Sequence, residues 1–245
     1  MNTNGKLIYE GKAKKIFAHE DPDKVIIEFK DDATAFNAAK KAKFEGKGRL
    51  NCSISSSIFE YLIKNNIPTH FLERKGYQSI IAHKIDIIPI EVVLRNTAYG
   101  SICNQTNLLP GTILKEPIID FYYKDDSLND PLLTRDRINL MGIIEIQDLK
   151  YVEDLTYMIN RLLKQFFSNL NLNLVDFKLE FGWNKNKKIV LADEFSPDNC
   201  RLWDMMSQND KMKSLDKDRF RNDLGDLIKA YSEINKRIDH FISST

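Results

Sequence analysis

Cysteine, histidine and net charge are all scarce in this chain of 245 residues. Its three cysteines are far apart and form no Cys-x-x-Cys pair, and its four histidines are equally dispersed. This pattern argues against a disulfide framework and against a structural zinc site. The 36 lysine and arginine residues nearly cancel the 35 aspartate and glutamate residues, which leaves a formal net charge of +1. Because proteins that bind duplex phosphate usually carry a basic excess, nucleic-acid binding is not expected.

Long apolar runs are also missing. No stretch approaches the roughly 20 residues that span a bilayer, and residues 1–6 lack the hydrophobic core of a secretory signal. With 42% hydrophobic and 29% charged residues, the composition excludes disorder, collagen and a pure coiled coil. We therefore expect a soluble, cytoplasmic protein without membrane contact. Its length allows either one large α/β domain or two smaller lobes.

Short runs of β-branched and aromatic residues predict an antiparallel sheet in the first 95 residues. Apolar residues at helical spacing interrupt these runs and predict a helix over residues 51–65. Asn51 or Ser53 is expected to cap this helix, and Pro68 prevents it from continuing further. The strands are expected at Leu7–Tyr9, Lys15–Phe17, Val25–Phe29, Ser79–Ile85 and Ile90–Leu94.

The rest of the chain combines predicted helices with a less regular middle. Repeated proline and glycine predict a loop-rich stretch over residues 97–145, and long loops of this kind often bind ligands. Apolar residues at helical spacing predict helices over residues 148–170 and 216–241, whose apolar faces belong to the core. We therefore expect an α+β fold with a smaller, mainly antiparallel N-terminal lobe (residues 1–90) and a larger α+β lobe (residues 91–245).

The most informative segment, residues 174–182, alternates between apolar and charged side chains. Asp176, Lys178 and Glu180 share one face of the predicted strand. A second strand ends at Asp193, so a hairpin between the two strands brings Glu180 near Asp193, within about two residues of register. Two carboxylates beside a lysine suit Mg²⁺ with phosphate oxygens. A solvated strand face with paired charges is the other interpretation, and the alternation does not exclude it.

Two further segments concentrate charge in loops. The stretch from Asp193 to Asp204 places acidic residues, Arg201 and Trp203 around a proline turn. It indicates either a ligand site or a surface network of aspartate and arginine anchored by Trp203. Residues 11–15 offer a glycine and three lysines that can bend over a polyphosphate. This turn matches neither a Walker A loop nor a Gly-x-Gly-x-x-Gly fingerprint. A solvated lysine turn without a ligand is therefore the alternative interpretation.

Several motifs occur in order along the chain: Glu10–Lys14, Gly46–Gly48, Ile88–Asn96 with Gly100-Ser101, Asp176–Gly182, Asp193–Asp198 with Arg201–Asp204, and Asp216–Arg221. Together they resemble the phosphoribosylaminoimidazole-succinocarboxamide synthase (SAICAR synthetase) family, and the resemblance covers nearly the whole chain. The chain departs from the family at Asn37-Ala38-Ala39, where a glycine-containing turn is expected. Its hairpin turn at Lys185–Lys188 is also longer than in some members.

The resemblance implies an ATP-dependent ligase of de novo purine biosynthesis. The family joins L-aspartate to the carboxylate of carboxyaminoimidazole ribonucleotide, through an acyl phosphate, and yields SAICAR, ADP and phosphate. The resemblance also implies a two-lobed α+β architecture, ATP-grasp-like or kinase-like, with antiparallel sheets, flanking helices and the nucleotide in the cleft between the lobes. Mg²⁺ is the expected cofactor, and a homodimer is one arrangement that is left open.

Roles for individual residues follow from the same resemblance. Glu180 and Asp193 are expected to hold Mg²⁺. Lys178 is expected to neutralise charge at the reacting carboxylate, with Asp176 beside it in the catalytic group. The expected ATP-binding residues are Gly11, Lys12, Lys14, Lys84 and Lys124, and the expected substrate-binding residues are Arg95, Ser101, Asp198, Arg201 and Arg219.

Two other functions are compatible with parts of this pattern. A small-molecule kinase would share the lobes and the metal hairpin, and a requirement for aspartate in net ADP formation distinguishes the ligase from it. A nucleotide-binding regulatory module without turnover predicts loss of a metal-binding or phosphate-binding residue. Glu180, Asp193, Lys12 and Arg201 are nevertheless all present. A covalent acyl-enzyme is disfavoured, because no cysteine or serine lies in a nucleophile motif beside a histidine.

Overall fold

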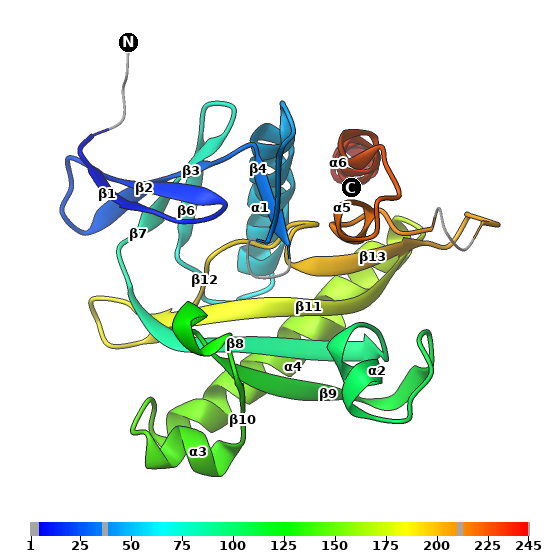
Figure 1. Cartoon of the computed structure of the whole chain (residues 1–245). Coiled ribbons are helices and arrows are strands. Elements are labelled where there is room, and N and C mark those ends of the chain that lie inside the picture. The colour runs from blue at the N-terminus through cyan, green and yellow to red at the C-terminus, as the bar shows by residue number, and fades with distance from the viewer. Residues whose placement is uncertain (1–4, 36–38, 210–212, 245) are drawn as a thin grey trace.

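Two antiparallel sheets with helices packed against them form the framework of the chain, shown as a computed structural model in Figure 1. The structure describes residues 5–35, 39–209 and 213–244. The departure from the family pattern at Asn37 and Ala38 lies outside these residues. The first sheet takes its strands from residues 7–83, and the second takes its strands from residues 86–204. The α+β class with antiparallel sheets is therefore confirmed.

The first sheet has the strand order β1-β2-β3-β7-β6, and every neighbouring pair is antiparallel. Helix α1 (Lys47–Lys64) packs against this sheet, and a separate hairpin, β4 (Asp32–Ala35) and β5 (Lys40–Lys43), precedes the helix. The strands of the sheet are β1 (Leu7–Glu10), β2 (Lys14–Ala18), β3 (Lys24–Phe29), β6 (Phe71–Lys75) and β7 (Ser79–His83).

Helix α1 begins four residues earlier than its apolar stripe predicts. Gly46 precedes it with φ of 84°, a left-handed conformation that glycine adopts without strain. The Gly48 amide then donates a hydrogen bond of 2.9 Å to Oδ1 of Asp31, the residue just before β4. The helix start is therefore set by a glycine turn and a distant aspartate, and the expected caps Asn51 and Ser53 lie inside the helix.

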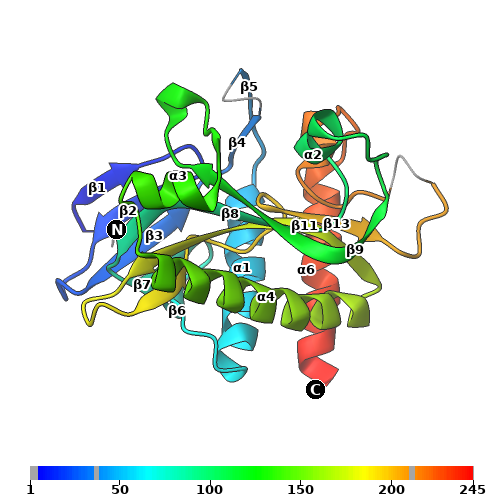
Figure 2. The same ribbon diagram turned by 90° about the horizontal axis from the view of Figure 1, so that it is seen from below.

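The second sheet is built around β11 (Leu172–Trp183), which pairs with β8 along one edge and with β12 and β13 in succession. Helix α4 (Ile146–Asn169) packs along the sheet, as Figures 1 and 2 show. The predicted stripe of α4, from Val152 to Phe166, is buried apart from Leu162, which is half-buried. The other strands are β8 (Asp86–Thr97), β9 (Ile113–Tyr123), β10 (Leu132–Leu133), β12 (Ile189–Ala192) and β13 (Cys200–Asp204).

The stretch expected to be loop-rich, residues 97–145, contains an 11-residue strand, β9, which corrects that expectation. Pro117 lies inside β9, where β10 pairs only with Phe121 and Tyr122. A proline is tolerated at such an unpaired strand edge because no neighbouring strand needs its missing N–H. Three short helical turns interrupt the loops of the remaining stretch, namely α2 (Ser101–Gln105), η1 (Asp126–Leu128) and α3 (Arg135–Leu140).

The helix expected over residues 216–241 is interrupted, and this is a second correction. It divides into α5 (Asp218–Arg221) and α6 (Leu227–Ser244), because Asp223, Gly225 and Asp226 between them adopt positive φ. The apolar stripe survives the break, since Leu227, Tyr231, Ile234 and Ile238 are buried. Helix α6 packs against α1, and the two helices run side by side in Figure 2. The end of the chain therefore returns to the helix of the first sheet.

Candidate active site

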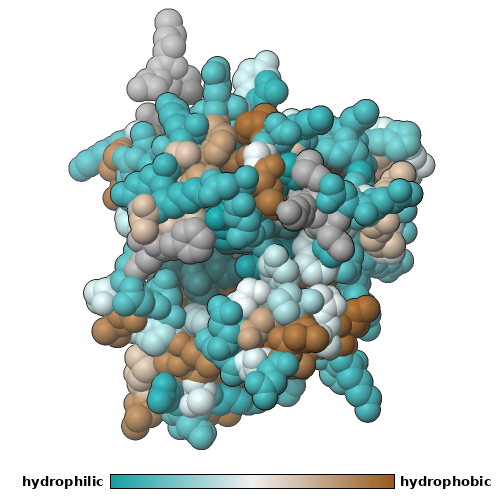
Figure 3. Space-filling view, turned by 45° about the vertical axis from the view of Figure 1, so that its right-hand side comes forward, coloured by the Kyte–Doolittle hydropathy of each residue, from teal (hydrophilic) through white to brown (hydrophobic). Residues whose placement is uncertain are grey.

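A cavity of about 1190 Å³ lies between the two sheets and is lined by residues of both. Figure 3 shows the molecule hollowed between its upper and lower halves. Ligand pockets are typically roughly 300–1,000 Å³, so this cavity has room for more than one small molecule. The expected site residues that line it are Gly11, Lys12, Lys14, Lys84, Arg95, Ser101, Lys124, Asp176, Lys178, Glu180, Asp193, Asp198 and Arg201.

Strand β11 supplies the charged floor of the cavity. Asp176, Lys178 and Glu180 all line it, as does Phe177, while Leu179 between Lys178 and Glu180 is buried in the core. The hairpin register is also as expected, because Glu180 pairs with Ala192, the residue before Asp193. Asp176 and Glu180 are each only 3% exposed, so this face of the strand is not a solvated surface.

The middle of the cavity, which we call the lysine centre, joins Lys14, Lys124 and Lys178 to buried and half-buried carboxylates. The Lys178 Nζ lies 2.6 Å from Glu180 Oε1, 3.0 Å from Glu91 Oε1 and 3.6 Å from Asp193 Oδ2. Lys14 forms an ion pair with Asp193, and Lys124 forms one with Glu180. The centre therefore alternates positive and negative groups along its length.

These contacts shift the protonation equilibria of the lysine centre toward the charged forms. Burial alone would raise the pKa of Asp193, but Lys14 and Lys178 outweigh it and hold that pKa below its usual range. Burial opposes the charge on Lys178 as well, yet Glu180, Asp193 and Glu91 raise its pKa well above the ordinary value. The pKa of Glu180 is lowered, since Lys178 and Lys124 overcome the effect of burial. Lys178, Glu180 and Asp193 are therefore ionised near neutral pH.

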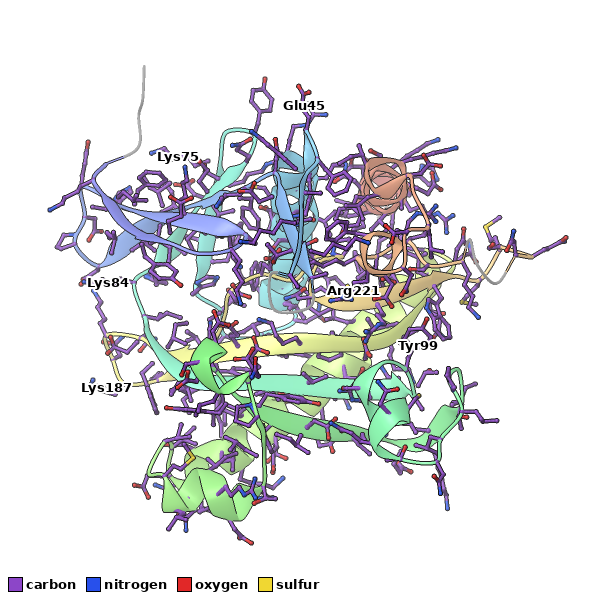
Figure 4. All side chains as sticks on the ribbon, viewed as in Figure 1. Glu45, Lys75, Lys84, Tyr99, Lys187 and Arg221 are labelled. Carbon is purple, nitrogen blue, oxygen red and sulfur yellow. The ribbon has the colours of Figure 1, made fainter. Side chains whose placement is uncertain are left out.

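Four of the five residues expected to bind ATP approach the cavity from the first sheet and its connections, whereas Lys124 follows β9 of the second sheet. The turn between β1 and β2 carries Gly11 and Lys12, and the Lys12 Nζ lies 2.6 Å from Oδ1 of Asp126 in η1. Lys84 is exposed on the segment that joins the two sheets, and Figure 4 shows it at the left edge of the molecule, away from Arg221 near the middle of the view. Apolar side chains from β2 and β3, among them Ile16 and Val25, line the cavity near this turn.

The other end of the cavity, which we call the arginine end, is organised around Asp176. Strand register places Asp176 of β11 directly opposite Arg95 of β8 and Arg201 of β13. Oδ2 of Asp176 accepts hydrogen bonds from both arginines, at 3.4 Å from Arg95 Nη1 and 2.7 Å from Arg201 Nη1. Arg95 also donates to Ser101 Oγ at 3.0 Å, so three expected substrate residues meet here.

Further acids fix the direction of each guanidinium group. Nε of Arg95 donates to Asp120 at 2.8 Å, and Nε of Arg201 donates to Asp218 at 2.7 Å. Burial would lower the pKa of Arg201, but Asp176 and Asp218 raise it above its ordinary value. Both arginines are therefore charged, and the aspartates that bind their Nε atoms orient the guanidinium groups.

Asp198 lies in the same cavity and is held by two residues without a predicted role, Lys47 of the Gly46–Gly48 motif and Tyr231. The Lys47 Nζ lies 2.6 Å from Asp198 Oδ2, and the Tyr231 hydroxyl donates to Oδ1 at 2.7 Å. Lys47 comes from the first turn of α1 and Tyr231 from α6, and both are buried. Burial raises the pKa of Asp198, but Lys47 and Lys217 outweigh it and keep the carboxyl ionised.

Arg219 is the one expected site residue that the structure does not bring to the cavity. Its guanidinium group donates to the backbone carbonyls of Ser214, Leu224 and Gly225, at 2.7 to 3.1 Å. These contacts indicate that Arg219 stabilises the break between α5 and α6. Lys217 and Arg221, two positions away on either side, line the cavity in its place.

Other functional candidates had no predicted role, although Glu91 and Glu194 lie inside the motifs Ile88–Asn96 and Asp193–Asp198. Glu91 and Glu194 contact lysines of the centre, and the Lys14 Nζ lies 3.0 Å from Glu194. His70 lines the cavity and its Nε2 lies 3.1 Å from the backbone carbonyl oxygen of Asp193. Burial lowers the pKa of His70 to about 4, so its ring is neutral near pH 7. The strand alternation and the hairpin predicted that Glu180 and Asp193 lie close together. No comparable pattern in the sequence predicts the positions of Glu91, Glu194 and His70.

Comparison with known proteins identifies relatives over nearly the whole chain. The family model for SAICAR synthetase matches residues 7–238. A phosphoribosylaminoimidazole-succinocarboxamide synthase of Prochlorococcus marinus subsp. pastoris is 69% identical, with 99% of this chain and 100% of the relative covered. One of Synechococcus sp. is 51% identical, over 97% of this chain and 95% of the relative.

Solved structures show the same similarity in three dimensions. The phosphoribosylaminoimidazole-succinocarboxamide synthase of Ehrlichia chaffeensis has a TM-score of 0.92 at 44% identity, covering 96% of this chain and 98% of its own. A SAICAR synthetase (Type-2) in complex with ADP has a TM-score of 0.89 at 48% identity. This match covers 94% of this chain and 96% of the solved chain.

The fold and the cavity define an α+β enzyme whose two sheets enclose a cavity lined by several lysines and arginines, a lining that suits the phosphates and carboxylates on which ATP-dependent ligases act. With a family match that spans residues 7–238 and relatives covered almost from end to end, the chain belongs to the SAICAR synthetase family. It is an ATP-dependent ligase of purine biosynthesis that joins L-aspartate to carboxyaminoimidazole ribonucleotide. The kinase and the regulatory module find no support in these comparisons. Among the helices that the structure describes, none has the length and apolar character of a membrane span.

Proposed function

We propose that ATP and the ribonucleotide lie end to end in the cavity, with their reacting groups at the lysine centre. The observation that carries this proposal is the order of side chains on β11. Asp176 orients the arginine end, Lys178 lies next to it on the same face, and Glu180 follows at the lysine centre. One strand therefore links a site for a retained phosphate to a site for a transferred one.

We assign the ATP phosphates to the side of the cavity formed by Gly11, Lys12, Lys14, Lys84 and Lys124. Lysine is a compact cation with a flexible stem, which suits phosphate oxygens whose charge changes during reaction. The apolar side chains of β2 and β3 nearby suit an adenine ring. The solved relative in complex with ADP supports the presence of a nucleotide site in this family.

We assign Mg²⁺ to Glu180 and Asp193, and the donor set fits this ion. Both carboxylates are ionised, and both reach one cation in the structure, the Lys178 Nζ. Within the described residues, no three or more histidine, cysteine, aspartate or glutamate side chains form a metal-binding group. Mg²⁺ commonly takes one or two carboxylates and completes its shell with substrate phosphates and water, so a two-carboxylate site suits it. When bound with ATP, the ion would neutralise charge on the transferred phosphoryl group.

We assign the ribonucleotide 5′-phosphate to Arg95, Ser101 and Arg201. A guanidinium group presents a planar fork that matches phosphate geometry, and an oriented fork loses less freedom on binding. Asp198, held by Lys47 and Tyr231, is assigned to the ribose and base. Lys217 and Arg221 line the same region and leave cations available for the two carboxylates of L-aspartate.

The chemistry follows from the poor reactivity of a carboxylate toward amines. One oxygen of the imidazole carboxylate attacks the γ-phosphorus of ATP, the bond to ADP breaks, and an acyl phosphate forms. The aspartate amine, after losing a proton, attacks the acyl carbon, and phosphate leaves with the oxygen that it gained. Lys178 lies where it can offset the negative charge of both anions as they approach. No covalent bond to the enzyme is needed.

An isotope experiment tests this route directly. With ¹⁸O in both oxygens of the imidazole carboxylate, one labelled oxygen should appear in the released phosphate for each amide formed. Mass spectrometry of the phosphate measures this transfer. Unlabelled phosphate would mean that water or an enzyme group attacked ATP, and the acyl-phosphate route would be wrong. Omission of L-aspartate is the control, because net ADP release should then stop after at most one turnover.

Two coarser features complete the proposal. We propose a cytoplasmic enzyme, a view supported by its use of ATP and by Cys52, Cys103 and Cys200 being free thiols. We also propose a homodimer as its solution state. Sedimentation equilibrium across a range of protein concentrations tests the dimer, which predicts a mass twice the 28.5 kDa of one chain.

A further inference from the structure

The backbone at Asp193 adopts an uncommon conformation directly after strand β12. Its φ is 61°, in the left-handed region that non-glycine residues visit in only a few per cent of cases. Along an extended strand, successive side chains point to opposite faces, so the left-handed turn decides where the Asp193 carboxylate points. Any group that holds this peptide therefore also controls the direction of the carboxylate.

Residues 68–70, just before β6 of the first sheet, hold the end of β12. The Leu191 amide donates to the Pro68 carbonyl at 2.9 Å, and the His70 amide donates to the Leu191 carbonyl at 2.8 Å. The His70 side chain extends this contact toward the turn, because its Nε2 lies 3.1 Å from the carbonyl oxygen of Asp193. A carbonyl oxygen only accepts hydrogen bonds, so Nε2 must carry the proton.

The His70 ring is itself held in place. It is 3% exposed, and its edge packs against the Phe59 ring with 5.4 Å between ring centroids. The His70 carbonyl accepts a hydrogen bond of 2.7 Å from the His83 amide at the end of β7. The ring is therefore anchored in the first lobe while its Nε2–H reaches the turn of the second.

We propose that His70 is a positioning residue for the metal site: its Nε2–H holds the left-handed turn at Asp193 and aims that carboxylate at Glu180 and Lys178. This inference rests on the proposed assignment of Mg²⁺ to Glu180 and Asp193. It extends that assignment by naming a residue of the other lobe that keeps the two carboxylates together.

Three substitutions separate the hydrogen bond from the bulk of the ring. In His70→Gln the side-chain amide nitrogen can occupy the place of Nε2, whereas in His70→Asn it reaches only as far as Nδ1. His70→Leu fills the space without a donor. The Gln and Asn variants share one chemistry and differ in reach alone, so this pair carries the test even if the Leu variant does not fold.

Titration calorimetry of ADP, with and without Mg²⁺, gives a readout that does not depend on turnover. The quantity of interest is the factor by which Mg²⁺ tightens ADP binding. Loss of one buried hydrogen bond predicts that this factor falls about five- to tenfold in His70→Asn and His70→Leu, and less than about twofold in His70→Gln. ADP affinity without Mg²⁺ should stay unchanged in all three variants. In steady state, the KM for Mg²⁺ should rise while the KM for the ribonucleotide does not.

Thermal unfolding and a Glu180→Gln control complete the design. If the Asn and Leu variants lose thermal stability but keep the full effect of Mg²⁺, His70 is only a structural residue and the inference is wrong. Glu180→Gln should abolish most of the Mg²⁺ effect. If it does so while His70→Asn and His70→Leu do not, the inference alone fails. If Glu180→Gln binds Mg²⁺ and ADP like the wild type, the metal assignment fails and the inference fails with it.

Discussion

The lysine centre and the arginine end of the cavity both gather cations around buried acids, but they hold these cations differently. Lys178 sits among Glu91, Glu180 and Asp193, which all lie within 3.6 Å of its Nζ. Arg95 and Arg201 each have an aspartate behind Nε and share Asp176 through Nη1. The lysines are paired with the acids that are assigned to the metal, whereas the arginines are fixed by acids that have no other proposed partner.

The difference matches the two tasks in the proposed reaction. At the lysine centre, ligand binding must exchange partners, because Mg²⁺ and phosphate displace ion pairs that are already formed. A flexible ammonium group can follow such an exchange. At the arginine end nothing reacts, so a rigid fork oriented in advance gives the greater benefit. We therefore expect substitutions at the centre to change turnover and substitutions at the end to change affinity.

The largest effect is expected from Lys178→Met at the lysine centre. Removing this cation leaves three carboxylates facing the approaching anions, and loss of a preorganised electrostatic contact of this kind predicts a fall in kcat of about 10²–10³. The KM for the ribonucleotide should change much less. Steady-state ADP release measures both constants. A kcat within tenfold of the wild type would show that Lys178 is not part of the reacting centre.

At the arginine end, Arg201→Lys should raise the KM for the ribonucleotide about tenfold or more, because the lysine loses the charge-assisted fork but keeps the charge. The KM for ATP should stay within about twofold, since contacts at separate sites act independently. Arg74→Lys is a matched control, because Arg74 is an exposed arginine that bonds Ser53 and Tyr77. Equal rises in both KM values would show that Arg201 serves the whole cavity.

A pH experiment sharpens the comparison within the arginine end. Burial and the neighbouring Asp218 raise the pKa of Asp216 from 3.8 to about 7. Between about pH 4 and 7 the folded state thus keeps a proton at Asp216 that the unfolded state has released, so this stabilising contribution is lost progressively as pH rises through 7. Between pH 5 and 8 the free energy of unfolding of the wild type should fall by about 2 kcal/mol more than that of Asp216→Asn. Urea unfolding of both proteins at the two pH values measures this difference, and parallel changes would contradict it.

The smallest effect is expected at the edge of the lysine centre, from Lys12. Its side chain is 44% exposed and is paired with Asp126, which is 65% exposed. Exposed ion pairs are worth about 0–1 kcal/mol, so Lys12→Met should raise the KM for ATP less than about fivefold. Asp126→Asn releases Lys12 and should lower that KM slightly. An increase with Asp126→Asn would show that Asp126 itself contacts the nucleotide.

Much of the lysine centre could be predicted because its signal is local. The alternation of residues 174–182 and the hairpin after it bring Glu180, Lys178 and Asp193 together through neighbouring chain segments. The α+β class with antiparallel sheets was predictable for the same reason, since short alternating runs define strands. The 1–90 and 91–245 division stays a proposal, although the change from the first sheet to the second occurs between His83 and Asp86.

The arginine end was harder to predict from the sequence, because its geometry depends on the register between strands that are distant along the chain. Arg95 and Asp176 are separated by 81 positions, and no local pattern indicates that they face each other. The prediction for Arg219 illustrates a second difficulty. A continuous helix over residues 216–241 gives no means of deciding which arginine faces a ligand. The left-handed residues around Gly225 end that helix early, and Arg221 and Lys217 line the cavity while Arg219 bonds the backbone of the break.

Strand β11 fixes the distance between the two ends of the cavity. Its residues advance by about 3.3 Å each, so Asp176 and Glu180 are set roughly 13 Å apart along a single continuous element. Movement of one lobe against the other cannot alter that interval, because both residues belong to the same strand. In the proposed arrangement, the span from the anchored phosphate to the reacting carboxylate therefore keeps one length, and this length would restrict the acceptor to molecules of matching size.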